Sequence, residues 1–127
     1  MNFKEVEEII LKEDSNISVI LKDMSKSEII YKYNELMKIP SASVIKIIIM
    51  IEAVNQVVKG QFKLDEVIAI EDKYKVEYSI ISELQINRFT FKDLITLMII
   101  VSDNTATNLL IDLLGESNIN GLAKDLG

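Results

Sequence analysis

Two short strings of polar residues in this chain have the residue types and spacing of an acyl-transfer site. Ser43 and Lys46 open one apolar stretch, and Ser102-Asp103-Asn104 separates two others. At the first turn of a helix, Ser43 would lie at the positive end of the helix dipole, where a developing oxyanion is stabilised. Lys46, three residues later, would lie on the same face, within reach of the Ser43 hydroxyl. Because apolar neighbours favour the neutral form of a lysine, we predict that Lys46 accepts the Ser43 proton.

Each string also has an ordinary structural interpretation. A Ser-x-x-Lys spacing arises by chance at roughly one position in a few hundred. A Ser-Asp-Asn string is also typical of a polar loop in which Asp103 or Asn104 caps the following helix. The two strings together are much rarer than either one, and their combination favours a site.

The composition limits what other chemistry is available. The 127 residues include no Cys and no His, which excludes disulfides, structural zinc and the usual general base near neutral pH. Acid–base chemistry must therefore use Lys, Glu, Asp, Tyr or Ser, and we predict no metal and no cofactor. The net charge is −6, with no basic cluster, so we predict no nucleic-acid partner.

Hydropathy predicts a globular chain. Hydrophobic residues make up 49% of it, enough for one domain over residues 1–127, with a helix and hairpin in 1–38 and a helical region in 39–127. The most apolar runs, 44–51 and 94–101, are far shorter than the roughly 20 residues of a membrane span. The start lacks a signal-peptide pattern. Localisation stays open: cytoplasmic if this start is native, extracellular or cell envelope if a leader was removed.

The residue pattern predicts a mixed α/β fold that is mainly helical. Strands are expected at 17–23 and 28–33, forming a hairpin that belongs to an antiparallel sheet, with a brief strand within 64–70. The expected helices are 2–13, 43–58, 91–101, 105–114 and 118–126. The helix at 43–58 is apolar nearly all round, which predicts that protein surrounds it. Thr90, with Asp93 three residues on, predicts a capping box.

In the order of these features, the chain resembles the N-terminal half of a class A β-lactamase or a related penicillin-recognising serine hydrolase. The likeness rests on an opening helix and hairpin, on Ile39-Pro40-Ser41-Ala42-Ser43-Val44-Ile45-Lys46, on Tyr78-Ser79, and on Ser102-Asp103-Asn104-Thr105-Ala106-Thr107-Asn108-Leu109-Leu110. The pair Ser-x-x-Lys and Ser-Asp-Asn is known in this group. The resemblance implies a β-lactamase-like fold and a β-lactam or related acyl substrate.

The resemblance also implies catalytic and substrate-binding roles. Ser43 would be the nucleophile that opens the β-lactam ring, and Lys46 would help to deprotonate it. Ser102 would pass a proton to the leaving ring nitrogen. Asn104 would bind the amide side chain of the substrate and contact Lys46, and Tyr78 would line the mouth of the cleft.

Two further residues would be structural by the same resemblance. Asp103 would fix its own loop, and Asn108 would steady the loop that carries the deacylating Glu. Residues 1–127 contain no counterpart of that loop or of the family's Lys-Thr-Gly strand. Glu116 directly follows a helix end, so we interpret it as a surface residue rather than as the missing Glu.

We therefore expect a serine hydrolase by lineage, present here as a truncated chain. Three outcomes stay open for this chain: hydrolysis through a Ser43 acyl-enzyme, acylation without turnover as in a penicillin-binding or sensor module, and a non-catalytic unit. The last would associate with itself, as a homo-oligomer, or with a missing C-terminal half, because an unpaired hairpin edge and an apolar helix offer surface that another chain can cover.

Overall fold

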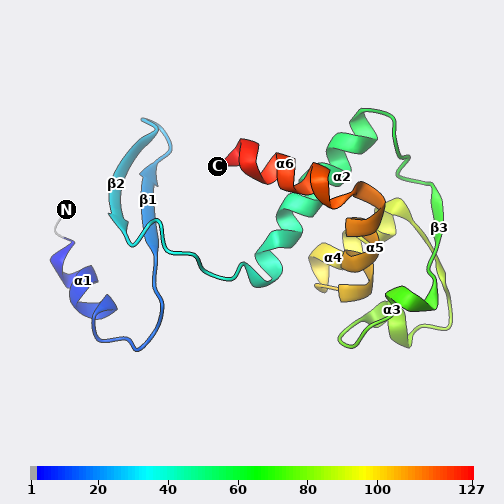
Figure 1. Ribbon diagram of the computed structural model, residues 1–127, viewed down its shortest axis with the longest axis horizontal. Helices are drawn as coiled ribbons and strands as arrows, with labels where there is room; N and C mark the ends of the chain where they lie inside the picture. Colours follow the sequence, from blue (N-terminus) through cyan, green and yellow to red (C-terminus); the bar gives the residue numbers. More distant parts are fainter. Residues whose placement is uncertain (1–2) are drawn as a thin grey trace. The chain divides into compact units, whose positions relative to one another are not determined.

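The computed structural model describes residues 3–127, which belong to two compact units, Met1–Pro40 and Ser41–Gly127. The described residues form six α-helices and two short antiparallel sheets (Figure 1). The predicted mixed α/β fold, mainly helical in this chain, is therefore confirmed. No helix in this part of the chain is long and apolar enough to cross a membrane.

The first unit contains a short helix and the predicted hairpin. Helix α1 covers Lys4–Ile10, and strand β1, Val19–Asp23, pairs antiparallel with β2, Glu28–Tyr33. The second strand has the predicted bounds. The observed helix is shorter than the predicted 2–13, whose first residue, Asn2, lies outside the described residues.

Local hydrogen bonds and one aromatic contact fix this first unit. Asp23 Oδ1 accepts hydrogen bonds from the backbone N–H groups of Ser25, at 2.8 Å, and Lys26, at 3.2 Å. This arrangement closes the tight turn between the strands, as Asp side chains commonly do. The rings of Phe3 and Tyr31 stack with 4.5 Å between their centroids, which joins the start of the chain to β2.

The second unit is built from four longer helices, a one-turn helix and one small sheet. The longer helices are α2, Ile45–Val58; α4, Phe91–Ile100; α5, Asn104–Leu114; and α6, Glu116–Leu126. A 3-10 turn at Ala42–Val44 leads into α2. Between α2 and α4 lie β3, Val67–Ala69; a 3-10 turn, Asp72–Tyr74; α3, Ile80–Glu83; and β4, Arg88–Thr90, which pairs antiparallel with β3. The predicted brief strand within 64–70 is confirmed as β3, whereas β4 and α3 were not predicted.

Helix ends in the second unit follow the expected signals. Thr90 and Asp93 form the predicted capping box at the start of α4, with Thr90 Oγ1 accepting from Asp93 N–H and Asp93 Oδ2 accepting from Thr90 N–H. Gly115 separates α5 from α6 with φ +83°, a conformation that a Cβ disfavours. Helix α6 begins directly after it at Glu116, two residues earlier than predicted.

Helix α2 packs against α4, α5 and α6 (Figure 1). Its inward face carries Ile49 and Ala53, both fully buried, against a core that includes Phe91, Leu94 and Met98 of α4. The opposite face is open, and Val58 is 81% exposed. The prediction that protein surrounds this helix is therefore wrong for residues 3–127, because an apolar pattern on every side does not specify which side its neighbours cover.

Candidate active site

The side chains of Ser43, Lys46 and Ser102 meet in one cluster of the second unit. Ser43 Oγ lies 2.9 Å from Ser102 Oγ, and Lys46 Nζ lies 2.8 Å from the same Ser102 oxygen. Within residues 3–127, Ser43 and Lys46 share no hydrogen bond of their own. The Ser102 hydroxyl thus connects the two groups, whereas the sequence spacing had predicted a direct contact.

The packing of the helices explains how these residues meet. Ser43 lies in the 3-10 turn that precedes α2, rather than in the first turn of that helix as predicted, and Val44 N–H closes the turn on Ser41 O at 3.0 Å. Lys46 is the second residue of α2. Ser102 lies in the break between α4 and α5, both of which pack on α2. Tertiary packing therefore brings the break to the start of α2.

Lys46 is held by three acceptors. Its side chain is buried, with 5% of the residue exposed, and Nζ donates to Ser102 O at 2.6 Å, Ser102 Oγ at 2.8 Å and Asn104 Oδ1 at 3.0 Å. Burial lowers the pKa of the Lys46 ammonium, and the negative charge of Asp103 partly opposes that shift. An amine whose pKa is lowered in this way gives up a proton more readily and can then act as a base.

Asp103, the middle residue of the Ser-Asp-Asn loop, is buried, with 1% of the residue exposed. Its carboxylate accepts hydrogen bonds from Ser79 Oγ, at 2.9 and 3.0 Å, and from the backbone N–H groups of Ile81, at 3.1 Å, and Ala106, at 2.9 Å. The Ala106 contact is the N-cap of α5. These contacts tie the loop to α5 and to the segment around α3.

Three residues of the second unit combine a Cβ with a left-handed backbone conformation, as Ser27 and Asn34 do in the first unit. Ala42, Tyr78 and Ser102 have φ values of +45°, +58° and +56°, in the left-handed region that residues with a Cβ adopt rarely. Such residues persist where the surrounding structure fixes them, and they are frequent at active sites. Ala42 precedes Ser43, and Ser102 itself joins Ser43 to Lys46. The strain therefore supports the choice of this cluster as the candidate site.

The other predicted site residues have separate positions. Asn104 contacts Lys46, as the resemblance implied. Tyr78 is 88% exposed and immediately precedes Ser79. Asn108 lies one turn beyond Asn104 on α5, is exposed, and its side chain makes no hydrogen bond to the described residues. Glu116 is the exposed first residue of α6 and does not belong to the cluster.

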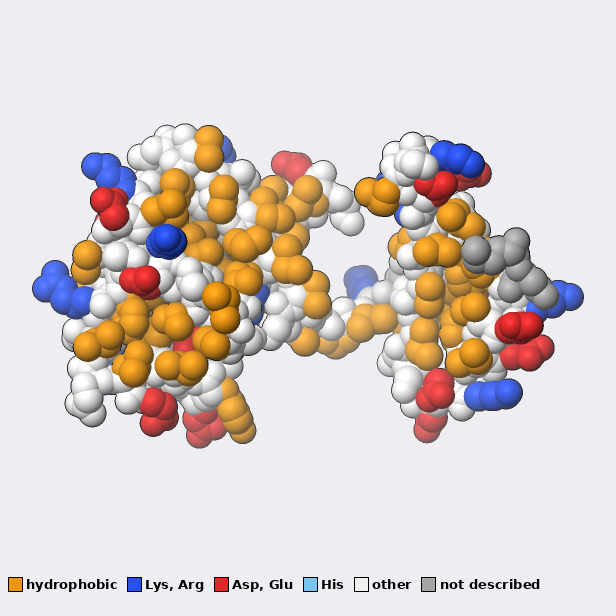
Figure 2. Space-filling view, turned by 180° about the vertical axis from the view of Figure 1, so that it is seen from behind, with side chains coloured by type: hydrophobic (Ala, Val, Ile, Leu, Met, Phe, Trp, Pro, Cys, Tyr) orange, Lys and Arg blue, Asp and Glu red, His pale blue; other side chains and the backbone are white. Residues whose placement is uncertain are grey.

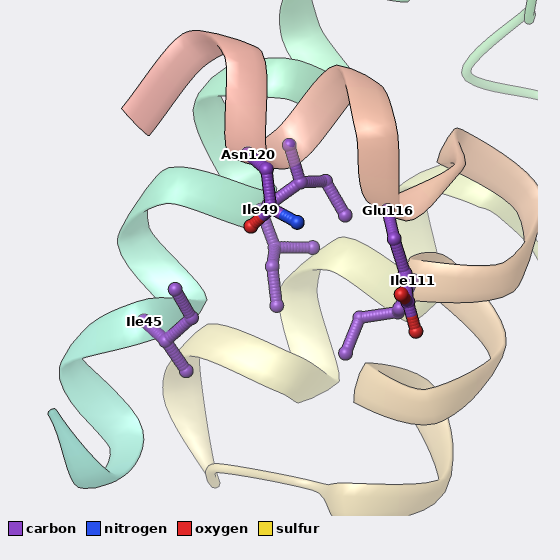
Figure 3. Close-up of a pocket in the computed structure, with 6 residues that line it drawn as sticks. Ile45, Ile49, Ile111, Glu116 and Asn120 are labelled. Carbon is purple, nitrogen blue, oxygen red and sulfur yellow. The ribbon is translucent and has the colours of Figure 1, made fainter. Parts of the chain in front are cut away.

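An apolar hollow of about 250 Å³ lies between α2, α5 and α6 (Figure 3). Its lining residues are Ile45, Ile49, Ile111, Glu116, Ile119 and Asn120. The hollow shares no residue with the cluster of Ser43, Lys46 and Ser102. Residues 3–127 contain no group of three acidic side chains arranged to hold a metal ion.

Sequence analysis missed two polar residues beneath the site. Ser79 was noted only as part of the Tyr78-Ser79 string, yet it donates to Asp103 and is 7% exposed. Thr105 is fully buried, although it stands in the first turn of a helix that follows a polar loop. No sequence signal shows that these hydroxyls are buried beneath the site, because the partners that join them there, Asp103 for Ser79 and Val76 for Thr105, lie more than twenty residues away in the chain.

The chain belongs to the β-lactamase enzyme family, whose model matches residues 3–127. A solved β-lactamase from Sphaerobacter thermophilus is 32% identical to it, with a TM-score of 0.76 over 87% of this chain and 41% of that one. An ancestral class A β-lactamase is 24% identical, with a TM-score of 0.86 over 98% of this chain and 48% of that one. The family and the β-lactamase-like fold expected from sequence are therefore confirmed.

A third solved structure, PBP-A, shares the fold at 21% identity, with a TM-score of 0.85 over 96% of this chain and 47% of that one. The chain thus spans about half the length of the solved proteins that it matches. A comparison with curated proteins gave no match.

Proposed function

We propose that this chain carries the acylation centre of a β-lactamase-like serine hydrolase, with Ser43 as the nucleophile and a β-lactam or related acyl compound as the substrate. The observation that carries the proposal is the hydrogen-bonded series Ser43 Oγ, Ser102 Oγ and Lys46 Nζ. A serine hydroxyl is a weak nucleophile until a base accepts its proton. The buried Lys46, with its lowered pKa, is suited to that role.

The proposed acylation uses four proton transfers, two toward Lys46 during the attack and two back from it when the ring opens. Ser43 Oγ attacks the lactam carbonyl carbon while its proton passes to Ser102 Oγ and the Ser102 proton passes to Lys46 Nζ, leaving an oxyanion. The bond between the carbonyl carbon and the ring nitrogen then breaks. The nitrogen takes a proton from Ser102, which regains one from Lys46. The product is an ester on Ser43 that retains every atom of the substrate.

Asn104 and Tyr78 are the proposed substrate-binding residues. The Asn104 carbonyl oxygen is engaged by Lys46, so its amide NH₂ group is the part that would donate to an acyl amide of the substrate. The exposed ring of Tyr78 would line the mouth of the site. Asp103 would fix the Ser-Asp-Asn loop, and Asn108 would steady the loop that carries the family's deacylating Glu.

A second candidate is acylation without turnover. Hydrolysis of the ester needs a base that activates water. Both oxygens of the buried Asp103 carboxylate are occupied by hydrogen bonds, and Glu116 lies outside the cluster. One solved relative, a point mutant of PBP-A, is described in an acyl-enzyme complex with penicillin G. A lasting ester on Ser43 would make this chain a penicillin-binding or sensor module.

A chromogenic β-lactam followed by colour and by intact mass together tests both candidates. Acylation predicts one adduct with the full mass of the substrate on Ser43, absent in Ser43→Ala and present in the control Ser41→Ala. Continuous colour would support a hydrolase, and a persistent adduct would support the second candidate. An adduct elsewhere, or one that survives in Ser43→Ala, would contradict the assignment of Ser43.

A third candidate is a non-catalytic unit that associates with itself or with a complementary C-terminal half. Apolar side chains are exposed on the faces of both units that Figure 2 presents. The exposed apolar residues of the described chain include Ile20 and Ile30 of the hairpin and Val54 and Val58 of α2, which a partner could cover. In that case the two units would form parts of one larger domain. Sedimentation over a range of concentrations tests self-association, and a monomer at every concentration would count against it.

A further inference from the structure

The segment that carries Tyr78 is attached to the Ser-Asp-Asn loop by buried side chains. Residues 76–82 include the strained Tyr78, with φ +58°, and the one-turn helix α3. The segment contacts Asp103 at one place and Thr105 at another. Asp103 and Thr105 are the two neighbours of Asn104 in the chain, and Asp103 directly follows Ser102. The segment is therefore attached to the residues that carry Ser102 and Asn104 of the candidate active site.

Ser79 makes the first attachment. Its hydroxyl donates to the Asp103 carboxylate, whose oxygens lie 2.9 and 3.0 Å away, and accepts a hydrogen bond from Ser82 N–H at 3.2 Å. The other two donors to this carboxylate are backbone N–H groups, those of Ile81 and Ala106. Ser79 is therefore the one side chain in residues 3–127 that donates to the Asp103 carboxylate, whereas Thr107 Oγ1 donates to the Asp103 backbone O at 2.6 Å.

Thr105 makes the second attachment. Its Oγ1 accepts from Val76 N–H at 3.3 Å and lies 3.0 Å from Ser82 Oγ. Because Ser82 Oγ uses its own hydrogen to donate to Val76 O, at 2.9 Å, the Thr105 hydroxyl is the donor in its contact with Ser82. Each of these hydroxyls thus donates once and accepts once, and the second attachment does not depend on Ser79 Oγ.

We propose that Ser79 is a positioning residue of the acylation centre: it orients the Asp103 carboxylate, and Asp103 in turn holds Ser102 and Asn104 in contact with Lys46. Loss of the Ser79 hydroxyl leaves the Asp103 carboxylate with backbone donors only, those of Ile81 and Ala106. Ser102 can then relax from its left-handed backbone conformation, φ +56°. The effect of Ser79 on acylation rests on the proposed function, but its effect on the Ser-Asp-Asn loop does not.

The contacts at stake are short. Ser102 Oγ lies 2.9 Å from Ser43 Oγ and 2.8 Å from Lys46 Nζ, so a movement of about 1 Å breaks at least one of them. Misplacement of that size can cost on the order of 10²-fold in rate. We expect Ser79→Ala to lower the acylation rate constant by about 10–100-fold, with little change in the concentration of β-lactam that gives half the maximal rate. Ser79→Thr, which keeps a hydroxyl, should restore most of the rate.

The first experiment measures acylation by a fluorescent penicillin, together with the free energy of unfolding. Asn118→Ala serves as the control for stability, because it removes a hydrogen bond from Asn118 Nδ2 to Leu114 O, at 2.7 Å, that is not part of this loop. A larger rate loss in Ser79→Ala than in Asn118→Ala, with rescue in Ser79→Thr, supports the proposal. A wild-type rate in Ser79→Ala overturns it.

A second experiment separates this inference from the proposed function. In the free chain, the amide NMR signals of Ser102 and Asn104 report the loop, and hydrogen exchange at Ala106 N–H reports its bond to Asp103. We expect Ser79→Ala to shift these signals and to speed the exchange, and Ser79→Thr to leave both unchanged. If wild-type protein takes up no penicillin, the proposed function fails while this measurement still decides the inference. Unchanged Ser102 and Asn104 signals in Ser79→Ala would overturn the inference whatever the activity.

Discussion

Replacing Lys46 by Arg is expected to abolish acylation at Ser43 while a positive charge stays at the same place. The Lys46 amine has three acceptors, Ser102 O, Ser102 Oγ and Asn104 Oδ1, at 2.6, 2.8 and 3.0 Å. A guanidinium can donate to such acceptors, but it cannot lose a proton in a protein. The variant therefore tests the base and not the charge.

The expected loss follows from the role of the base. A positioned general base contributes about 10²–10⁴-fold to a rate, which corresponds to about 3–5 kcal/mol of activation free energy. Lys46→Met, which removes the base and all three hydrogen bonds, should lose at least as much activity. The free energy of unfolding of Lys46→Met should change by less than the activation free energy does, because removing a buried charge offsets the loss of the three hydrogen bonds.

The lowered pKa of Lys46 sets the direction of two pH effects. Because the neutral amine is the proton acceptor, acylation should rise with pH and level off above a pKa that lies below the ordinary value of 10.5. Between the lowered pKa and 10.5, the unfolded chain binds more protons at Lys46 than the folded chain. The free energy of unfolding contributed by Lys46 therefore rises with pH across that window, and the cost of burying the ammonium is fully present below it.

The assay measures acylation by a fluorescent penicillin, and urea unfolding, from neutral pH up to the ordinary lysine pKa. The free energy of unfolding of the wild type, relative to that of Lys46→Met, should increase as pH rises. Acylation of Lys46→Arg at the wild-type rate would refute the assignment of Lys46 as base. A wild-type acylation rate that does not change with pH would refute it as well.

Three further predictions concern stability and are checked by urea unfolding. Asp103→Ala leaves three donors, Ser79 Oγ and the N–H groups of Ile81 and Ala106, without their acceptor. Each unpaired donor costs about 1–3 kcal/mol, and the costs are not additive, so we expect a loss of about 3–5 kcal/mol in the free energy of unfolding. As a control, substitution of an exposed carboxylate, Asp65→Asn, should change it by under about 0.5 kcal/mol. Phe91 is fully buried and stacks on Phe62 with 4.7 Å between centroids, so Phe91→Ala should cost about 3–5 kcal/mol; a loss below 1 kcal/mol would contradict the core described above. Thr90→Ala removes the capping box of α4 and should cost about 1 kcal/mol, and Thr90→Ser should recover most of it.

Local elements of this fold were predictable because their causes lie within a few residues of one another. The strand Glu28–Tyr33 has the aromatic and β-branched composition of a strand, and it was found with the predicted bounds. Thr90 and Asp93 are three residues apart, which is the spacing that a capping box requires. The short strand β4 was missed because it is defined by its pairing with β3, about twenty residues earlier in the chain.

The sequence by itself determined the family, the hairpin, every helix except α3, and the residues whose types permit acyl transfer. Only the tertiary structure decided that Ser102 lies between Ser43 and Lys46, and that Ser79 donates to Asp103. It also decided which face of α2 is covered. The physical reason is distance along the chain: capping and periodicity act within one or two turns, whereas these contacts join residues that only the packing of α2, α4 and α5 brings together.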